Sequence, residues 1–313
     1  MTTLPAFVLG ADGGGTKTLG ILADAEGNEL ARFQVGPGNP NVVGVDGAAA
    51  NLLDLVAGCC ERAKVDASTL GAVVFGLAGV GSDAVRDRLT ESLRVGGASR
   101  GWEQMIYTIE TDARVALEGA FGGEAGVVII AGTGSNLIGK LPDGSVTTVG
   151  GWGRMLGDEG SGFAIGAEAI RAVTRAIDRR GDAQMLRTMF AERFGWTSRG
   201  AIITAVYQEK FDLASLAPLV LEAVEKGDPT AKGILATAAA QLADQLVAMV
   251  GHMGSLPSVR VVCIGGLIDH PTVYSRIVSE TILARIPTIR IHPAQFPPAG
   301  GAVIMALNLL KRI

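Results

Sequence analysis

Residues 12–18 read DGGGTKT, and these residue types could hold a chain of phosphates. The three glycines let the backbone turn tightly and bring several N–H groups close to phosphate oxygens. The hydroxyls of Thr16 and Thr18 and the amine of Lys17 would add further donors. Asp12 follows an apolar stretch and could hold a hydrated Mg²⁺, because this ion prefers few carboxylates and several waters. A plain tight hairpin is the alternative for this segment taken alone.

Neither of two widespread phosphate-binding patterns matches the chain. Residues 10–18 miss the pattern GxxxxGK[ST] by one position, because a threonine separates the last glycine from the lysine. That pattern also requires a helix next, whereas residues 17–24 are expected to form a strand. The glycines of residues 76–81 stand in a different order from the dinucleotide pattern GxGxxG. The sequence therefore favours a glycine hairpin over both patterns.

A second glycine-rich turn, with the letters AGTGSN, occupies residues 131–136. It follows the apolar stretch 126–131, just as the first turn follows residues 6–12. Segments 8–35 and 128–149 share one order: apolar strand, glycine-rich turn with threonine, strand, hairpin turn and strand. This weak internal repeat predicts two similar lobes derived from a duplicated unit. Two such turns could face each other across a cleft and hold one polyphosphate from both sides.

The pattern of apolar residues predicts alternating strands and helices. In the first part of the chain we expect strands at 6–12, 17–24, 29–35, 72–78 and 104–111 and helices at 46–64 and 83–94. In the second part we expect strands at 126–131, 137–141, 146–149, 259–264 and 288–292 and helices at 158–180, 182–192, 214–226, 229–252, 272–285 and 299–311. This alternation indicates an α/β fold.

The composition indicates a folded protein of about two domains. At about 150 residues per domain, a chain of 313 residues suggests two. The apolar share of 48% and the net charge of −4 exclude intrinsic disorder, which requires low hydrophobicity and high net charge. The 27 basic residues do not outnumber the 31 acidic ones, so nucleic acid is not expected as a partner.

Cysteine usage and the apolar stretches bear on the compartment. Cys59, Cys60 and Cys263 form no CxxC pair and no Cys/His ligand cluster, which is typical of reduced thiols in a cytosolic protein. The longest apolar stretch, residues 234–253, is interrupted by polar side chains, Gln245 among them. We therefore expect neither a signal peptide nor a membrane span, and a cytoplasmic location.

Seven motifs, spread in order over nearly the whole chain, point to one family. They are GADGGGTKT (10–18), GPGNPN (36–41), TDA (111–113), AGTGSN (131–136), GGWGRMLGDEGS (150–161), CIGGL (263–267) and GGA (300–302). In these motifs the chain resembles the N-acetylglucosamine kinases of the sugar kinase and actin superfamily. The related activators of radical acyl-CoA dehydratases share the fold but carry iron–sulfur cysteines, and the cysteines of this chain argue against that branch.

The resemblance implies two actin-like (ribonuclease H-like) lobes, each built on a βββαβα core, with ATP and sugar in the cleft between them. The N-terminal lobe would comprise residues 1–115, with the C-terminal helix 299–313 packing back on it. The C-terminal lobe would comprise residues 116–298. The resemblance further implies ATP and Mg²⁺ as cofactors, with Asp12 as the metal ligand.

The resemblance also assigns roles to individual positions. Asp112 would be the catalytic base and would contact the sugar together with Asn39, Gly150 and Asp158. The residues that would hold the nucleotide are Gly13, Gly14, Gly15, Thr16, Lys17, Gly132, Thr133, Gly134, Ser135, Gly265 and Gly266, the last two lying against the adenosine.

Both aspartates also have an ordinary structural explanation, because Asp often caps a helix N-terminus. Asp112 precedes the helical stretch 113–121 at the rim of the expected sheet, where a carboxylate could accept the proton of a hydroxyl that attacks phosphorus. Asp158 also precedes a helical stretch and, in a functional role, would accept hydrogen bonds from two sugar hydroxyls. Asn39 stands in a turn-rich loop and could serve the turn alone. Some family members have an aromatic residue two positions later, where this chain has Asn41.

Two neighbours of Asp158 complete the set of candidates. Glu159 is expected to be a solvated or capping residue. Trp152 could form a wall of the sugar pocket, or it could simply pack within or between the lobes.

Together these expectations describe a Mg·ATP-dependent kinase that phosphorylates the C6 hydroxyl of an amino sugar, N-acetylglucosamine above all. Glucosamine and N-acetylmuramic acid are alternatives within the class. An ATPase activator protein of the same fold is the alternative from another class, and it would hydrolyse ATP without sugar. The expected partner is the small amino sugar, with no nucleic acid and no membrane, and the apolar composition is compatible with a homodimer.

Overall fold

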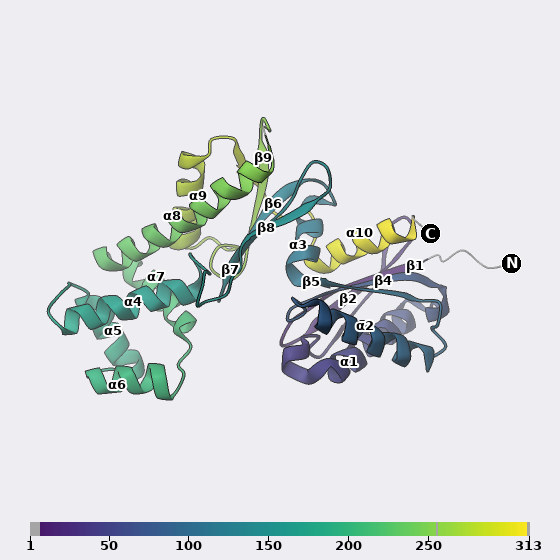
Figure 1. The fold of residues 1–313 in the computed structure, drawn as a ribbon, viewed down its shortest axis with the longest axis horizontal. Coiled ribbons are helices and arrows are strands. Elements are labelled where there is room, and N and C mark those ends of the chain that lie inside the picture. The colour runs from purple at the N-terminus through teal and green to yellow at the C-terminus, as the bar shows by residue number, and fades with distance from the viewer. Residues whose placement is uncertain (1–6, 255, 312–313) are drawn as a thin grey trace. The chain divides into compact units, whose positions relative to one another are not determined.

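The computed structural model describes residues 7–254 and 256–311, which fold into two compact units (Figure 1). The first unit takes the described residues up to 125 and those from 293 onward, and the second takes residues 126–292. Each unit contains one five-stranded sheet together with helices. The predicted α/β fold with two lobes is therefore confirmed.

The first sheet places the ends of three parallel strands side by side. Its order is β3(Glu29–Val35), β2(Thr18–Asp24), β1(Phe7–Gly13), β4(Leu70–Leu77) and β5(Ile106–Thr111). The first three strands pair antiparallel, whereas β1, β4 and β5 run parallel. Gly13 lies opposite Leu77, and Leu77 lies opposite Thr111. The residues that follow β1 and β5 therefore meet at one edge of the sheet, where ligands bind in folds of this kind.

Helices cover both faces of this sheet. They are α1(Pro40–Ala63), α2(Asp83–Ala98), α3(Asp112–Phe121) and α10(Pro298–Leu310), with a short 3₁₀ turn at Ala67–Thr69 before β4. Leucines of α1 and α2 share one hydrophobic core with Leu9 and Phe75 of the strands. Residues of α3 and α10 share a second core with Val8 and Val74. Successive strand residues point to opposite faces, so the sheet is buried on both sides.

The final helix packs against β1 and α3 because small residues let it come close. A Cβ on Gly10 would lie 2.1 Å from the Val303 nitrogen, and a Cβ on Gly301 would lie 2.0 Å from the Val115 oxygen. No side chain fits at such distances, so glycine is required at both positions. Since α3 packs on α10, the first unit continues to residue 125, whereas the lobe boundary expected at 115 would cut through α3.

The second sheet repeats the arrangement of the first, as the internal repeat predicted. Its order is β10(Ile289–Ile291), β9(Val259–Ile264), β6(Gly126–Ala131), β7(Ser135–Lys140) and β8(Val146–Gly150). Here β6, β7 and β8 pair antiparallel, and β6, β9 and β10 run parallel. The turn that follows β6 therefore corresponds in position to the turn that follows β1.

Helices make up most of the rest of the second unit. They are α4(Gly162–Ile177), α5(Gln184–Phe194), α6(Arg199–Ile203), the π-helical turn η2(Thr204–Gln208), the 3₁₀ turn η3(Leu213–Leu216), α7(Ala217–Glu225), α8(Pro229–His252) and α9(Val273–Arg285). The helix predicted for 158–180 begins only at Gly162. The reason is that Asp158 and Gly160 have left-handed φ angles of 61° and 80°, which an α-helix does not contain.

Two helices, α1 and α8, are long and apolar enough to cross a membrane by length and composition alone. Each of them buries one face in the core of its own unit. Leu52 and Val56 of α1 are buried there, as are Leu242 and Leu246 of α8. Core helices pass the same test of composition, so this apolarity by itself does not indicate a membrane span.

Candidate functional site

The predicted site residues fall into two groups, one in each unit. In the first unit, Asp12 lies at the end of β1 and Asp112 is the first residue of α3, directly after β5. Burial and, to a smaller extent, the negative charge of Asp112 raise the pKa of Asp12 to about 6, against an opposing effect of Lys17. The two carboxylates are therefore close enough to repel each other.

This pair of carboxylates fits a divalent cation. Among the described residues, no cluster of three or more His, Cys, Asp or Glu side chains forms a complete metal cage. Mg²⁺ does not need one, because it keeps several waters and usually binds one or two carboxylates together with substrate phosphates. A cation beside Asp12 would also stabilise its charged form, which burial and the charge of Asp112 disfavour. The residues present thus suit a hydrated Mg²⁺.

The capping alternative for Asp112 is not what the structure shows. Thr111 is the N-cap of α3, and its hydroxyl accepts the Arg114 N–H at 3.1 Å. The Asp112 side chain is exposed, and its Oδ1 accepts only the N–H of Ala113, at 2.8 Å. Thr111 is thus the N-cap, while Oδ1 of Asp112 satisfies one N–H of the first helical turn. Among the described residues none donates to Oδ2, which is therefore available for a ligand.

The first glycine turn is open at its tip. The Gly14 N–H donates to the Lys17 oxygen at 3.0 Å, and the Gly38 N–H donates to the Gly14 oxygen at 3.2 Å. Thr16 and Lys17 are exposed at the tip, so their donors can face a ligand. The hydroxyl of Thr18 is different, because it is buried and donates to the oxygen of Gly36 at 2.9 Å. Of the two threonines, only Thr16 suits the predicted role as a phosphate donor.

In the structure the side chain of Asn39 forms part of a turn, which is the structural alternative to sugar binding that the sequence left open for this residue. It is the N-cap of α1, and its Oδ1 accepts the Asn41 N–H at 2.8 Å. The adjoining chain is tightly packed, since a Cβ on Gly79 would lie 2.2 Å from this oxygen. Within the described part of the chain, the amide nitrogen of Asn39 is the polar atom left to meet a ligand.

The second glycine turn is anchored to the start of α4. The Gly162 N–H donates to the Gly132 oxygen at 2.8 Å, and the Phe163 N–H donates to the Thr133 oxygen at 3.1 Å. The buried Ser135 hydroxyl donates to the oxygen of Glu159 at 2.7 Å. Ser135 thus positions the turn. Because the Gly132 N–H already donates to the Gly134 oxygen at 2.9 Å, the turn can offer phosphate its remaining N–H groups and the hydroxyl of the exposed Thr133.

Asp158 is a buried carboxylate beside this second turn. Its carboxylate packs over Gly134, where a Cβ would lie 2.9 Å from Oδ2. Ser161, and not Asp158, caps α4 by accepting the Ala164 N–H at 3.2 Å. Among the residues that the structure describes, none donates a hydrogen bond to the Asp158 carboxylate. Asp158 is 9% exposed, and its carboxylate oxygens are not fully buried, so they can accept hydrogen bonds from a ligand. Its left-handed, non-glycine backbone is of a kind that clusters at ligand sites.

Sequence analysis missed one residue of this site, Gln245 on α8. Its Nε2 donates to Glu159 Oε2 at 2.9 Å, and a Cβ on Gly150 would lie 2.7 Å from its Oε1. Glu159 is therefore held by a side-chain amide and is not simply solvated, as the sequence suggested. Gln245 Oε1 is buried and has no hydrogen-bond partner in the described structure. The signal was available, since Gln245 interrupts an apolar helix, but nothing in the sequence identified its partners.

The glycines expected to face adenosine lie at the same sheet edge as the second turn. Gly265 follows β9 with a φ angle of 102°, and a Cβ there would lie 2.5 Å from the oxygen of Ala131. The Leu267 N–H donates to that same oxygen at 3.2 Å. Only glycine allows the chain to cross the end of β6 this closely. The crossing leaves Gly266 in open space, where a flat ring could lie against the backbone.

The cysteines offer no redox centre. Burial raises the pKa of the Cys59 thiol to about 12 and the pKa values of Cys60 and Cys263 to about 11. These thiols therefore stay protonated near neutral pH and are poor nucleophiles and metal ligands.

Comparison with known proteins gives consistent matches over both units. The sequence profile of the BadF/BadG/BcrA/BcrD ATPase family matches residues 9–306. An N-acetyl-D-glucosamine kinase of Dictyostelium discoideum is 32% identical over 97% of this chain and 98% of its own length. An N-acetylmuramic acid/N-acetylglucosamine kinase of Clostridium acetobutylicum is 29% identical over 96% of this chain and 98% of its own.

A solved structure extends the likeness to three dimensions. The crystal structure of a protein described as a candidate N-acetylglucosamine kinase, from Chromobacterium violaceum, is similar with a TM-score of 0.70. It is 25% identical and covers 97% of this chain and 100% of its own. The resemblance drawn from the seven motifs is thereby confirmed.

Proposed function

Because the chain belongs to the BadF/BadG/BcrA/BcrD ATPase family, we propose that it is an ATP-dependent kinase of an amino sugar, with N-acetylglucosamine as its preferred substrate. The position that receives the phosphate would be the C6 hydroxyl. One observation carries this proposal. Asp112 presents an exposed carboxylate near the half-buried Asp12 at the ends of parallel strands, and the N-cap of the following helix is Thr111.

In the proposed mechanism Asp112 accepts a proton from the sugar hydroxyl that attacks the terminal phosphorus. Oδ2 takes this proton, since Oδ1 already accepts the Ala113 N–H. Asp12 would hold a hydrated Mg²⁺, which when bound neutralises charge on the phosphates. The backbone amides of the first glycine turn and the exposed Lys17 would hold phosphate oxygens. Most of the catalysis in such reactions comes from alignment and charge neutralisation, and one carboxylate suffices for the late proton transfer.

Recognition of the sugar would rest on Asp158. A buried carboxylate that lacks donors can accept two hydroxyl groups, and hydrogen bonds to charged acceptors contribute about 1.5–3 kcal/mol each. Gly150, on the loop that Gln245 holds, would lie against the same sugar. Trp152 is 74% exposed on this loop and could form an apolar wall. Asn39 would contribute its amide nitrogen.

A second substrate, N-acetylmuramic acid, is favoured by the charge on the same loop. The Arg154 guanidinium stacks on the Phe163 ring at 5.7 Å, and it has no ion pair in the described part of the structure. N-acetylmuramic acid differs from N-acetylglucosamine by a lactyl group that ends in a carboxylate. A free guanidinium between Gly150 and Asp158 could pair with this carboxylate. The Clostridium acetobutylicum relative carries both sugars in its name.

A substrate panel tests the proposal. The purified chain with Mg·ATP would be assayed for ADP release with N-acetylglucosamine, N-acetylmuramic acid, glucosamine, N-acetylmannosamine and glucose. We expect the highest kcat/KM with N-acetylglucosamine, and excess chelator should stop the reaction. Rapid ATP hydrolysis that no sugar accelerates would instead support an ATPase activator. Phosphorylation that persists in excess chelator would remove Asp12 from its proposed role.

The compartment and assembly are proposed on the same basis. Three free thiols, two of them buried, fit the cytoplasm, where a kinase of a small sugar would find ATP. A homodimer remains a prediction from composition alone.

A further inference from the structure

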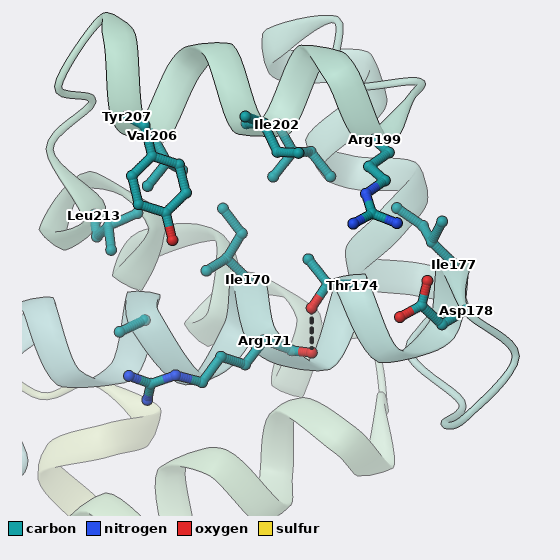
Figure 2. A pocket seen from close by; sticks show the side chains of 12 residues that line it. Ile170, Arg171, Thr174, Ile177, Asp178, Arg199, Ile202, Val206, Tyr207 and Leu213 are labelled. Atoms are coloured by element: carbon teal, nitrogen blue, oxygen red, sulfur yellow. Dashed lines mark hydrogen bonds between the residues drawn. The ribbon is translucent and has the colours of Figure 1, made fainter.

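The second unit contains a cavity of about 440 Å³ that lies outside every proposed kinase residue (Figure 2). Its walls come from α4 on one side and from α6, η2 and η3 on the other. The residues that line it fall between positions 167 and 213, so neither glycine turn nor the Gly150–Asp158 loop contributes to it. A volume of this size lies within the usual range of small-molecule pockets.

Part of the cavity wall is apolar. Ile170, Ile202, Val206 and Leu213 line it, and Figure 2 shows Ile170 and Ile202 reaching toward each other across the space. At its edge Tyr207 is 78% exposed. A large aromatic side chain in this position would gain free energy from an apolar ligand that covers it.

One end of the cavity carries an unpaired positive charge. Arg199 lines this end together with Ile177 and Asp178 (Figure 2). Asp178 is already paired with Arg180, at 3.2 Å. In the part of the chain that the structure describes, the Arg199 side chain makes no ion pair and no hydrogen bond.

The other charges around the cavity are also satisfied. Arg171, a second lining cation, forms an ion pair with Glu168, and Glu168 lies 3.9 Å from Arg175 as well. Glu168 and the lining carboxylate of Asp178 are thus both paired with arginines. Although the whole chain carries a net charge of −4, the residues that line the cavity include two arginines and one aspartate. An anion is the ligand that this balance favours.

The backbone of the wall is itself unusual. In the π-helical turn η2 the Glu209 N–H donates to the Thr204 oxygen at 3.0 Å, five residues back. Such turns are rare and are found frequently at functional sites. Each residue of a helix turns the chain by about 100°, so the widened turn changes which side chains face α4. Here the ones that line the cavity are Val206 and Tyr207.

We propose that this cavity binds a small organic anion, a carboxylate carried on an apolar ring or short alkyl chain. The carboxylate pairs with Arg199, and the apolar body lies between Ile170 and Ile202 with Tyr207 covering it. This site is separate from the proposed kinase site and does not depend on it.

The test uses the full chain with 4-phenylbutyrate as the probe and its uncharged amide as the matched ligand, both titrated by calorimetry. We expect saturable binding of one 4-phenylbutyrate per chain, with the amide bound about tenfold more weakly, because it lacks the charge-assisted hydrogen bond. Arg199→Gln should weaken 4-phenylbutyrate about tenfold and leave the amide unchanged. Arg94→Gln, which removes an exposed arginine of the first unit, is the control and should change neither ligand.

A second variant tests the cavity itself. Ile202→Trp should fill the space and abolish binding of both ligands, while a retained circular dichroism spectrum shows that the chain still folds. The proposal is overturned if 4-phenylbutyrate does not saturate at millimolar concentration, if the amide binds equally well, or if Arg199→Gln has no effect. It is also overturned if the wild-type chain is a dimer that Ile202→Trp converts to a monomer, since the cavity would then be covered by a second copy.

Discussion

The two glycine turns share one sequence plan, yet the structure uses them differently. The first turn has an open tip with exposed Thr16 and Lys17, and two interacting carboxylates lie at the same sheet edge. The second turn is tied to α4 by two backbone hydrogen bonds, and the hydroxyl of Ser135 is already engaged. The first turn is anchored in the same way, because the N–H groups of Gly38 and Asn39 donate to the Gly14 oxygen and the Thr18 hydroxyl donates to the Gly36 oxygen. The two turns therefore differ in the charges beside them: the first has the interacting pair Asp12 and Asp112, and the second has Asp158.

The two aspartates show the same division. Asp112 is exposed and interacts with Asp12, which suits proton transfer near a cation. Asp158 is buried and lacks donors in the described structure, which suits recognition of hydroxyl groups. Each lies close to a hydroxyl residue, Thr111 or Ser161, that caps the following helix in its place. Variants at the two positions should therefore fail in different kinetic parameters.

The largest effect is expected for Asp112→Asn. Loss of the base should lower kcat about 10³-fold while the KM for the sugar changes little, as measured by steady-state ADP release. Asp83→Asn is the matched control, because Asp83 is the first residue of α2 and follows the cap Ser82. That control should keep normal turnover. Near-normal turnover of Asp112→Asn would show that Asp112 is not the base.

Asp158→Asn should raise the KM for the sugar about 10²-fold and lower kcat less, because a charged acceptor for two hydroxyls is lost. Asp158→Gly separates function from folding. It should lose sugar affinity as well, yet stabilise the fold by about 1 kcal/mol, since glycine accepts the left-handed φ angle of 61° without strain. Thermal unfolding and sugar titration of the same sample measure both. A Gly variant that binds sugar normally would contradict the role of Asp158.

A smaller effect is expected at Gln245, whose side chain donates a hydrogen bond to Glu159 and packs against Gly150. Gln245→Ala removes the hydrogen bond to Glu159 and should lower the free energy of unfolding by about 1 kcal/mol. It should also raise the KM for the sugar several-fold without changing the KM for ATP. Equal changes in both KM values would argue for a general loss of structure instead. Gln241→Ala, an exposed position one turn earlier on α8, serves as control.

The last prediction concerns the pH dependence of stability and not turnover. Folding raises the pKa of Asp12 from 3.8 to about 6. Between pH 3.8 and about pH 6 the Asp12 carboxyl is therefore largely protonated in the folded state and largely ionised in the unfolded state. The contribution of Asp12 to stability therefore falls as pH rises through this window. Relative to Asp12→Asn, the wild-type chain without metal should lose stability from about pH 4 to pH 6 and then level off. Thermal unfolding of both proteins across this range checks it, and a constant difference would be inconsistent with a raised pKa.

The sequence predicted most of the fold and of the candidate site, but it did not predict the contacts between distant residues. Apolar periodicity and the glycine turns predicted the two sheets and their repeat, because these signals are local. Whether Asp112 caps the helix or takes part in catalysis could not be predicted from its residue type, and only the family resemblance favoured catalysis. The answer depends on which neighbouring side chain accepts the N–H groups at the start of α3, and in the structure this is Thr111. The hydrogen bond between Gln245 and Glu159 joins positions 86 residues apart, and no local pattern encodes such a partner. The π-helical turn at η2 was likewise not expected.

The central claim is that ATP is used to place a phosphate on the C6 hydroxyl of an amino sugar. The most direct measurement is a phosphorus–proton NMR correlation spectrum of the product formed from N-acetylglucosamine and Mg·ATP. We expect the new phosphorus signal to correlate with the two protons on C6, and to be absent with Asp112→Asn. A correlation to the anomeric proton, or ATP consumed with only inorganic phosphate released, would contradict the account.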